Sequence, residues 1–169
     1  MKSESPAPTF CGYYPGLIGE VTALHAAYYA ERHGFTRAFE CQVARDLAEF
    51  AARAQGSRDL LLAVRRDGRL VGFLAVDGSL SDGLGARLRW FIVDPDEQGR
   101  GLGGLLLERA VAFLREAGFA RAFLWTFRGL DAARRLYERH GFLLVEEREA
   151  SPWGPPIVEQ RFALELAAG

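Results

Sequence analysis

The sequence of 169 residues is poor in the side chains that form metal centres and redox sites. It has two cysteines, Cys11 and Cys41, and three scattered histidines, and neither residue type recurs at a metal-binding or redox spacing. Lys2 is the only lysine, and the remaining twenty basic residues are arginines. We therefore expect reduced structural thiols, no metal site, no Schiff-base lysine and no P-loop lysine.

A strong net charge and long apolar runs are also missing. The net charge of -1 and the pI near 6.3 argue against a nucleic-acid-binding protein, which usually carries a clustered basic patch. No apolar stretch approaches the length of a membrane span, and the polar opening lacks the apolar core of a signal peptide. The sequence thus favours a cytoplasmic protein, monomer or homodimer, with neither nucleic-acid nor membrane partners.

What the sequence does contain is an alternation of strands and helices typical of a mixed α/β domain. Residues 1–8 are predicted to be a flexible tail and residues 9–169 a single domain. Apolar periodicity predicts a mixed, mostly antiparallel sheet of about seven strands, flanked on both sides by about four helices. The strands are expected at 9–14, 59–65, 70–76, 87–93, 121–127, 142–149 and 157–166, and the helices at 17–32, around 39–56, 105–117 and 131–139.

The chain is organised around a glycine-rich turn, residues 94–104, that joins a buried strand to a helix. The first amides of a helix have no internal partner and the helix dipole adds positive potential, so such a turn binds anions. Its four glycines let a phosphate approach the backbone, which predicts a cofactor that carries phosphates. Gly99, Gly101 and Gly104 also match a dinucleotide fingerprint, although five residues separate the strand from the first glycine and no ribose-binding acid follows.

Two segments resemble the GNAT superfamily of acyl-CoA N-acyltransferases. Gln98 to Gly103, preceded by Val93-Asp94-Pro95, is similar to its pyrophosphate-binding motif, and Ala133 to Phe142 is similar to its pattern Ala-x-x-Leu-Tyr-x-x-x-Gly-Phe. The resemblance covers about Phe10 to Leu166. It is greatest to the acetyltransferase half of fusions with MarR-type regulators, which also end in a segment similar to Trp153 to Phe162. It implies a GNAT-like sheet that splays at the strands before and after the glycine turn.

The resemblance implies an N-acetyltransferase that moves an acetyl group from acetyl-CoA directly to a primary amine of a small molecule or peptide in a ternary complex. Tyr137 is implied as the acid that protonates the leaving thiolate. A noncatalytic acyl-CoA-binding sensor with the same fold is the alternative, and it would need no acid at this position. The implied cofactor-binding residues are Phe91, Ile92 and Val93 along the pantetheine arm, and Gln98, Gly99, Arg100, Gly101, Leu102, Gly103 and Gly104 around the pyrophosphate.

Two positions depart from the family pattern. Leu130, with Asp131 beside it, stands where an asparagine often contacts the cofactor, and Arg87 stands where many members carry a carboxylate. An alkyl amine with a pKa near ~10 is mostly protonated at neutral pH, so some group must accept its proton. The sequence leaves that group open among Glu31, His33, Glu149 and Glu159.

Two arginines at the start of the fourth strand suggest what the acceptor carries. Alternation along the strand predicts Arg87, Arg89, Phe91 and Val93 on one face. A guanidinium can hold a carboxylate in a bidentate pair, so Arg87 and Arg89 are candidate ligands for an acceptor that is both an amine and an acid. The alternative is that both arginines pair with nearby acids or extend into solvent.

Overall fold

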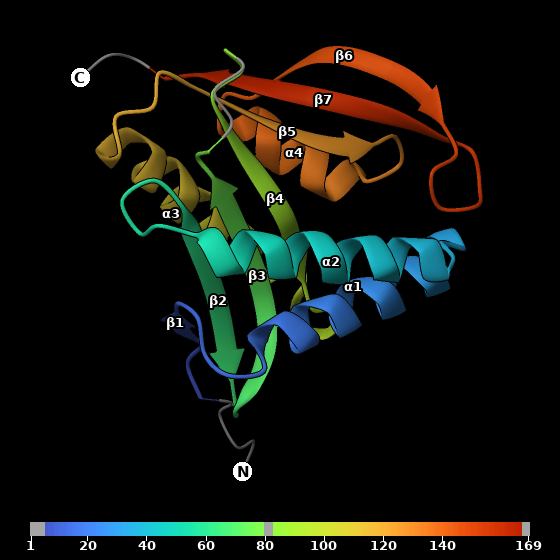
Figure 1. Ribbon diagram of the computed structural model, residues 1–169, viewed down its shortest axis with the longest axis horizontal. Helices are drawn as coiled ribbons and strands as arrows, with labels where there is room; N and C mark the ends of the chain where they lie inside the picture. The colour runs from blue at the N-terminus through green and yellow to red at the C-terminus, as the bar shows by residue number, and fades with distance from the viewer. Residues whose placement is uncertain (1–5, 80–82, 167–169) are drawn as a thin grey trace.

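The computed structural model describes residues 6–79 and 83–166. Within them lie a seven-stranded sheet and four α-helices (Figure 1), the mixed architecture that the sequence predicts. Residues 1–5 of the predicted tail lie outside the described part. In chain order the elements are β1 (Thr9–Cys11), α1 (Leu17–His33), α2 (Arg37–Arg53), β2 (Leu60–Arg66), β3 (Arg69–Asp77), β4 (Ala86–Val93), a 3-10 turn (Pro95–Glu97), α3 (Leu102–Glu116), β5 (Arg121–Phe127), α4 (Asp131–Arg139), β6 (Leu143–Ala150) and β7 (Ile157–Glu165).

The sheet has the strand order β1-β2-β3-β4-β5-β7-β6. Strands β4 and β5 are parallel and are connected through α3, whereas every other neighbouring pair is antiparallel. The β4–β5 pair therefore lies where two antiparallel halves of the sheet meet, and the chain crosses from one half to the other through the glycine-rich turn.

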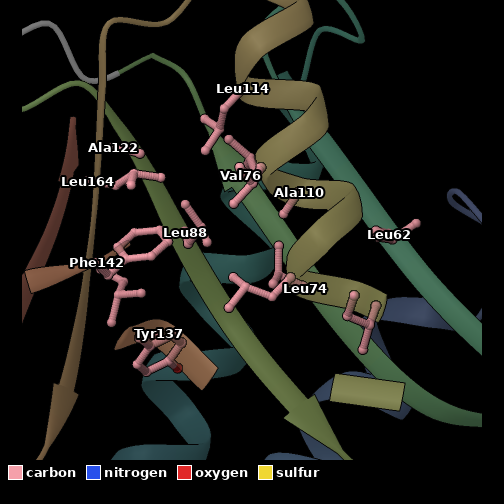
Figure 2. Packing of buried hydrophobic residues seen from close by; sticks show 14 of the residues in the cluster. Leu62, Leu74, Val76, Leu88, Ala110, Leu114, Ala122, Tyr137, Phe142 and Leu164 are labelled. Carbon is pink, nitrogen blue, oxygen red and sulfur yellow. The ribbon is translucent and has the colours of Figure 1, made fainter. Parts of the chain in front are cut away.

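Helices cover both faces of the sheet. Figure 1 shows α1 and α2 side by side in front of it, with α3 and α4 behind. On the α3 side, Ala110 and Leu114 pack against Leu74 and Val76 of β3 (Figure 2). On the opposite side, Phe73 of β3 belongs to a second buried cluster with residues of α1 and α2. Each fully buried leucine or phenylalanine contributes about 2 kcal/mol, so both layers hold the central strands in place.

Helix α3 begins earlier than the sequence predicts. Leu102 is its first residue, three positions before the expected start at Leu105, so Gly103 and Gly104 lie inside its first turn. A Cβ atom at Gly103 would lie 3.0 Å from Cδ1 of Leu136, because α4 packs closely on the start of α3 at this point. Glycine is a poor helix former in isolation, and this tertiary contact is what requires it here.

The first strand is shorter than expected. It ends at Cys11, where its pairing with Ala63 of β2 ends, rather than at Tyr14. None of the described helices is both long and apolar enough to cross a membrane.

Candidate active site

Strands β4 and β5 separate along their length. They pair only from Ala86 to Leu88 on β4 and from Ala122 to Leu124 on β5. Beyond these residues the later half of β4 has no β5 partner, so the backbone amides and carbonyls on that edge can pair with an extended ligand, while the other edge stays paired with β3. The expected splay at the strands before and after the glycine turn is therefore present.

A β-bulge interrupts β4 at the point of separation. Ala75 of β3 pairs with Arg89 and Phe73 pairs with Ile92, so Leu74 alone faces two residues of β4, Trp90 and Phe91. Trp90 has a φ of 51°, a left-handed conformation that is rare for a bulky residue and costs on the order of 1–3 kcal/mol. Contacts of the Trp90 ring with Phe50 and with the Arg89 guanidinium accompany this conformation.

The bulge moves side chains to the opposite face from the one that strict alternation predicts. Phe91 and Val93 pack with the α3-side cluster, whereas Trp90 and Ile92 pack with the cluster of α1 and α2. The expectation that Arg87, Arg89, Phe91 and Val93 share one face is therefore wrong, because the extra residue changes the alternation after Arg89. Arg87, Arg89 and Phe91 nevertheless line one cavity, which lies where β4 and β5 separate.

The glycine turn exposes backbone donors. Gly99 and Gly101 have φ values of 76° and 83°, and Gly101 is the N-cap of α3. The amides from Gly99 to Gly104 donate to no carbonyl of the described chain, and the first bond of this region is from Leu105 to Gly101, 3.2 Å. The Gln98 side chain donates to the carbonyl of Val93 at 3.1 Å and fixes the turn against the end of β4. A helix start with unpaired amides fits the pyrophosphate of coenzyme A.

A groove of about 940 Å³ extends from this turn into the splay. Most of the predicted cofactor-binding residues line it, namely Phe91, Ile92, Val93, Gln98, Gly99, Gly101, Gly103 and Gly104. Arg100 is not among the lining residues, although its guanidinium lies 3.6 Å from the carboxylate of Glu97, which lines the groove. Leu102 is buried in the core, so only its amide is available to a ligand.

Sequence reasoning missed the arginines of this groove. Arg32 of α1 and Arg135 and Arg139 of α4 all line it. The signal for two of them was available, since Arg135 and Arg139 are four residues apart and share one face of a helix. Leu130 and Asp131, which replace the usual asparagine contact, line the groove at the start of α4. The three arginines outnumber the two carboxylates of the groove, Glu97 and Asp131, and together with the amides of the turn they suit a ligand with several phosphates.

A second cavity of about 360 Å³ opens on the face of the sheet that α1 and α2 cover. Trp153, in the loop between β6 and β7, forms one wall and donates from its indole to Gln42 of α2 at 2.7 Å. Its carbonyl accepts from the amide of Thr36 at 2.9 Å, and its ring contacts Phe35 and Phe39. The loop is therefore fastened to the junction of α1 and α2 and closes this end of the cavity.

The groove and the cavity meet at four residues. Tyr29, Phe91, Leu130 and Ala133 line both. An acyl donor in the groove and an acceptor in the cavity would approach each other at this junction. The junction is therefore where the acetyl group would be transferred.

Tyr137 of α4 lines the cavity beside the junction. Its ring packs against Phe91, Phe142 and Phe162, and Figure 2 shows it next to Phe142 at the edge of the buried cluster. Burial raises the pKa of the Tyr137 hydroxyl, with a smaller contribution from Tyr29, so it stays protonated at physiological pH. The hydroxyl has no hydrogen-bond partner among the described residues and is available to donate to a ligand.

The two candidate arginines have different surroundings. Arg89 lies 3.3 Å from Asp77 and 3.6 Å from Asp46, so two carboxylates of the protein already neutralise it. Arg87 lines the same cavity, yet it has no hydrogen bond or ion pair with any described residue. Burial lowers the pKa of Arg87 to about 10, assisted by Arg89 and opposed by Asp77, Asp46 and Glu159. It is therefore a partly buried cation at neutral pH.

The four candidate proton acceptors are distributed unequally. Glu31 and Glu149 line neither the groove nor the cavity, and His33 lines the groove. Glu159 of β7 lines the cavity. Among the described residues, no group of three or more His, Cys, Asp or Glu side chains could hold a metal ion.

A histidine that sequence reasoning left unassigned also lines the cavity. His25 of α1 is fully buried, and its Nδ1 lies 2.8 Å from the carbonyl of Val21. Burial lowers the pKa of His25 to about 4, so the ring is neutral at physiological pH and Nδ1 is the donor to that carbonyl. A neutral imidazole with so low a pKa is a poor base for an alkyl amine.

Comparison with known proteins identifies the family of the chain. The model of the Acetyltransferase (GNAT) family matches residues 24–142. The [ribosomal protein bS18]-alanine N-acetyltransferase of Escherichia coli strain K12 is 32% identical over 123 residues, which are 73% of this chain and 76% of that protein. A mycothiol acetyltransferase of Streptomyces bingchenggensis is 33% identical over 110 residues, 64% of this chain, but this chain spans only about a third of its length, 34%.

Solved structures share the fold over nearly the whole chain. An acetyltransferase of Salmonella typhimurium, solved with its cofactor acetyl-CoA, superposes with a TM-score of 0.75 at 20% sequence identity, covering 97% of this chain and 96% of that one. The E. coli ribosomal-protein-S18-alanine N-acetyltransferase superposes with a TM-score of 0.69 at 23% identity, covering 96% of each chain.

Proposed function

The chain belongs to the Acetyltransferase (GNAT) family of acetyl-CoA-dependent N-acetyltransferases, and we propose that it acetylates the amine of a small acceptor that also carries a carboxylate. The observation that carries this proposal is Arg87, a partly buried cation in the cavity next to the cofactor groove that has no hydrogen bond or ion pair with any described residue. An unpaired buried charge is costly, and a ligand of opposite charge removes that cost. A carboxylate is the simplest such ligand for a planar guanidinium.

Acetyl-CoA supplies the acetyl group as an activated thioester, and the residues of the chain hold it and complete the transfer. The unpaired amides from Gly99 to Gly104 would hold its pyrophosphate, with Arg135 and Arg139 at the mouth of the groove. The free edge of β4 beyond Leu88 would pair with the pantetheine arm. Tyr137 would donate its proton to the departing sulfur. Cys11 and Cys41 line neither the groove nor the cavity, which supports direct transfer in a ternary complex.

Arg87 and Arg89 have separate roles in this proposal. Arg87 would bind the acceptor carboxylate, whereas Arg89 is held by Asp77 and Asp46 and stacks on the Trp90 ring, with its guanidinium carbon 4.1 Å from the ring centre. Arg89 thus becomes a positioning residue that keeps the bulged part of β4 in place. Of the two arginines that the sequence offers as ligands for the acceptor carboxylate, we therefore propose only Arg87.

The proposed acceptor differs from the acceptors for which two relatives are named. One relative is named for an alanine of a ribosomal protein and the other for mycothiol. Here the closed wall at Trp153 and the volume of about 360 Å³ favour a compact acceptor such as an amino acid. The noncatalytic acyl-CoA-binding sensor is the alternative function. The finer likeness to the acetyltransferase half of MarR-type fusions, which includes the segment from Trp153 to Phe162, is likewise a proposal.

An acceptor screen tests the proposal. Thiol release from acetyl-CoA would be measured with amino acids, their amides, the decarboxylated amines, polyamines and short peptides. We expect amino acids to be preferred, and no turnover with any amine would support the sensor instead. Arg87→Gln should raise KM for an amino acid roughly tenfold to a hundredfold, because a charge-assisted pair contributes about 1.5–3 kcal/mol, and should change KM for the amide much less.

Arg89→Gln is the comparison variant for this experiment. It leaves Asp77 and Asp46 without one cation, so KM for the amino acid and KM for its amide should change by similar factors. If Arg87→Gln also affects both substrates alike, or if a polyamine is the preferred acceptor, the carboxylate-binding role of Arg87 is wrong.

A further inference from the structure

We infer that Glu159 of β7 binds the ammonium group of the acceptor and accepts its proton. This inference rests on the proposed function. It assigns the proton acceptor that the sequence leaves open.

Glu159 is the cavity-lining member of the four candidates, and only half of its carboxylate is occupied. Its Oε2 accepts from Nε of Arg148 at 2.6 Å. Its Oε1 has no hydrogen-bond partner among the described residues, although the residue lines the cavity. A carboxylate with one oxygen fixed by a neighbouring arginine and the other free is oriented toward a ligand.

The other carboxylate of the cavity is less suitable. Oδ1 of Asp46 accepts from Nε of Arg45 at 3.0 Å, and its Oδ2 lies 3.6 Å from Arg89. Both oxygens thus face arginines of the protein. Glu159 is the carboxylate with an oxygen left for a substrate.

The register of the sheet places Glu159 near the junction of the groove and the cavity. Glu159 pairs with Phe127 of β5, and the Phe127 ring contacts Tyr29, which lies at the junction of groove and cavity. Arg87 pairs with Phe123, four residues earlier on β5. Four residues of a strand span about 13 Å, and β4 and β7 flank β5 about 10 Å apart, so the backbones of Arg87 and Glu159 are separated by roughly 16 Å. An arginine and a glutamate side chain can shorten this distance from both ends to about the size of an amino acid.

The two charges therefore define an orientation for a zwitterion. Arg87 would hold the carboxylate at the far end, and Glu159 would hold the ammonium beside the junction, where the acetyl donor enters. Each group of the acceptor would meet a charge of opposite sign. An ester or amide of the same amino acid would lose the first contact, and a deaminated acid would lose the second.

The other titratable groups of the cavity leave Glu159 as the proton acceptor. Tyr29 and Tyr137 are neutral because burial raises the pKa of each hydroxyl, and burial keeps His25 neutral by lowering its pKa. The charged groups that face the same cavity are Arg148 of β6, Arg87 and Arg89 of β4 and Asp46 of α2.

The proton transfers balance. An N–H bond of the ammonium breaks and an O–H bond forms on Oε1 of Glu159, which frees the nitrogen lone pair to form the C–N bond. The C–S bond breaks, the sulfur takes the Tyr137 proton, and the second nitrogen proton returns to Tyr137 through solvent. Glu159 then releases its proton to water, so one proton leaves for each acetyl group transferred.

The test is the pH profile of Glu159→Gln. In the wild type, kcat/KM for an amino acid should change little between about pH 7 and 9, because the bound ammonium is deprotonated in the complex. In Glu159→Gln it should be roughly 10²-fold lower at pH 7 and should rise about tenfold per pH unit, following the free amine in solution. An aminooxy acid, whose nitrogen is largely unprotonated at neutral pH, should be acetylated by both enzymes at similar rates.

Two further variants separate the chemical role from a structural one. Arg148→Gln breaks the same ion pair but keeps the carboxylate, so its pH profile should stay flat. Glu149→Gln, an exposed neighbour that lines neither ligand site, should behave as the wild type. The inference is overturned if Glu159→Gln has the wild-type pH profile, or if its kcat/KM falls equally for the amino acid and for the aminooxy acid. Absence of acetylation by the wild type would instead overturn the proposed function.

Discussion

Replacing Tyr137 with phenylalanine should lower turnover without lowering stability. The substitution removes one oxygen that has no hydrogen-bond partner in the described chain and retains the ring contacts with Phe91, Phe142 and Phe162. Loss of proton donation to the thiolate should reduce kcat roughly 10²-fold, which corresponds to about 2.7 kcal/mol of transition-state stabilisation. The free energy of unfolding should be unchanged or up to about 1 kcal/mol higher, because a desolvated hydroxyl is removed.

Tyr14→Phe is a matched control with the opposite signature. The Tyr14 hydroxyl donates to the Glu20 carboxylate at 2.9 Å, and Tyr14 lines neither the groove nor the cavity. Its loss should lower the free energy of unfolding by roughly 1 kcal/mol and leave kcat unchanged. Urea denaturation and thiol release under saturating acetyl-CoA would measure the two quantities on the same samples.

The outcome that refutes the role of Tyr137 is specific. If Tyr137→Phe has wild-type kcat while a solvent isotope effect shows that proton transfer limits the rate, the acid lies elsewhere. If KM for acetyl-CoA rises while kcat stays at the wild-type value, the hydroxyl binds the cofactor equally in the ground and transition states rather than donating a proton in the transition state.

Two remaining predictions concern the cofactor and acid stability. Acetyl-CoA at a hundredfold excess over its Kd should stabilise the fold by about 2.7 kcal/mol in thermal melts, whereas NAD should not, and Gly101→Val, at a φ of 83°, should abolish the shift by blocking the phosphate site. Because burial lowers the pKa of His25 from 6.5 to about 4, the unfolded chain binds a proton that the folded chain excludes, so stability should fall by roughly 3 kcal/mol as pH falls from 6.5 to 4. His25→Gln should lose that part of the acid sensitivity in urea titrations, and an unchanged pH slope would contradict it.

Local patterns account for the parts of the fold that the sequence predicts. The bounds of β5 and α4 agree with the structure, and Asp67 and Gly68 form the expected two-residue hairpin turn, with φ values of 52° and 75°. Each of these features depends on residues within a few positions of one another. The glycine turn was equally predictable, because its chemistry lies in backbone amides rather than in side chains from distant elements.

The bulge in β4 had no such signal. Nothing local in Arg89-Trp90-Phe91 indicates that Trp90 takes a left-handed conformation, since bulky residues disfavour it. The conformation depends on Phe50 of α2 and on the pairing with β3, both distant in sequence. Strict alternation was therefore the natural prediction, and it put Phe91 and Val93 on the wrong face.

The acceptor side illustrates the general limit, because its character depends on partners far apart in the chain. Arg87 and Arg89 are the same residue type two positions apart, yet Asp77 and Asp46 neutralise Arg89 and leave Arg87 for a ligand. Trp153 lines the same cavity, and its indole donates to Gln42, 111 residues away. Sequence could name the arginines and the candidate bases, but which cation is unpaired and which carboxylate has a free oxygen follows only from these long-range contacts. The two charges can be tested separately. Replacing Arg87 should weaken the preference for an acceptor with a carboxylate, and replacing Glu159 should weaken the use of an acceptor whose amine is protonated.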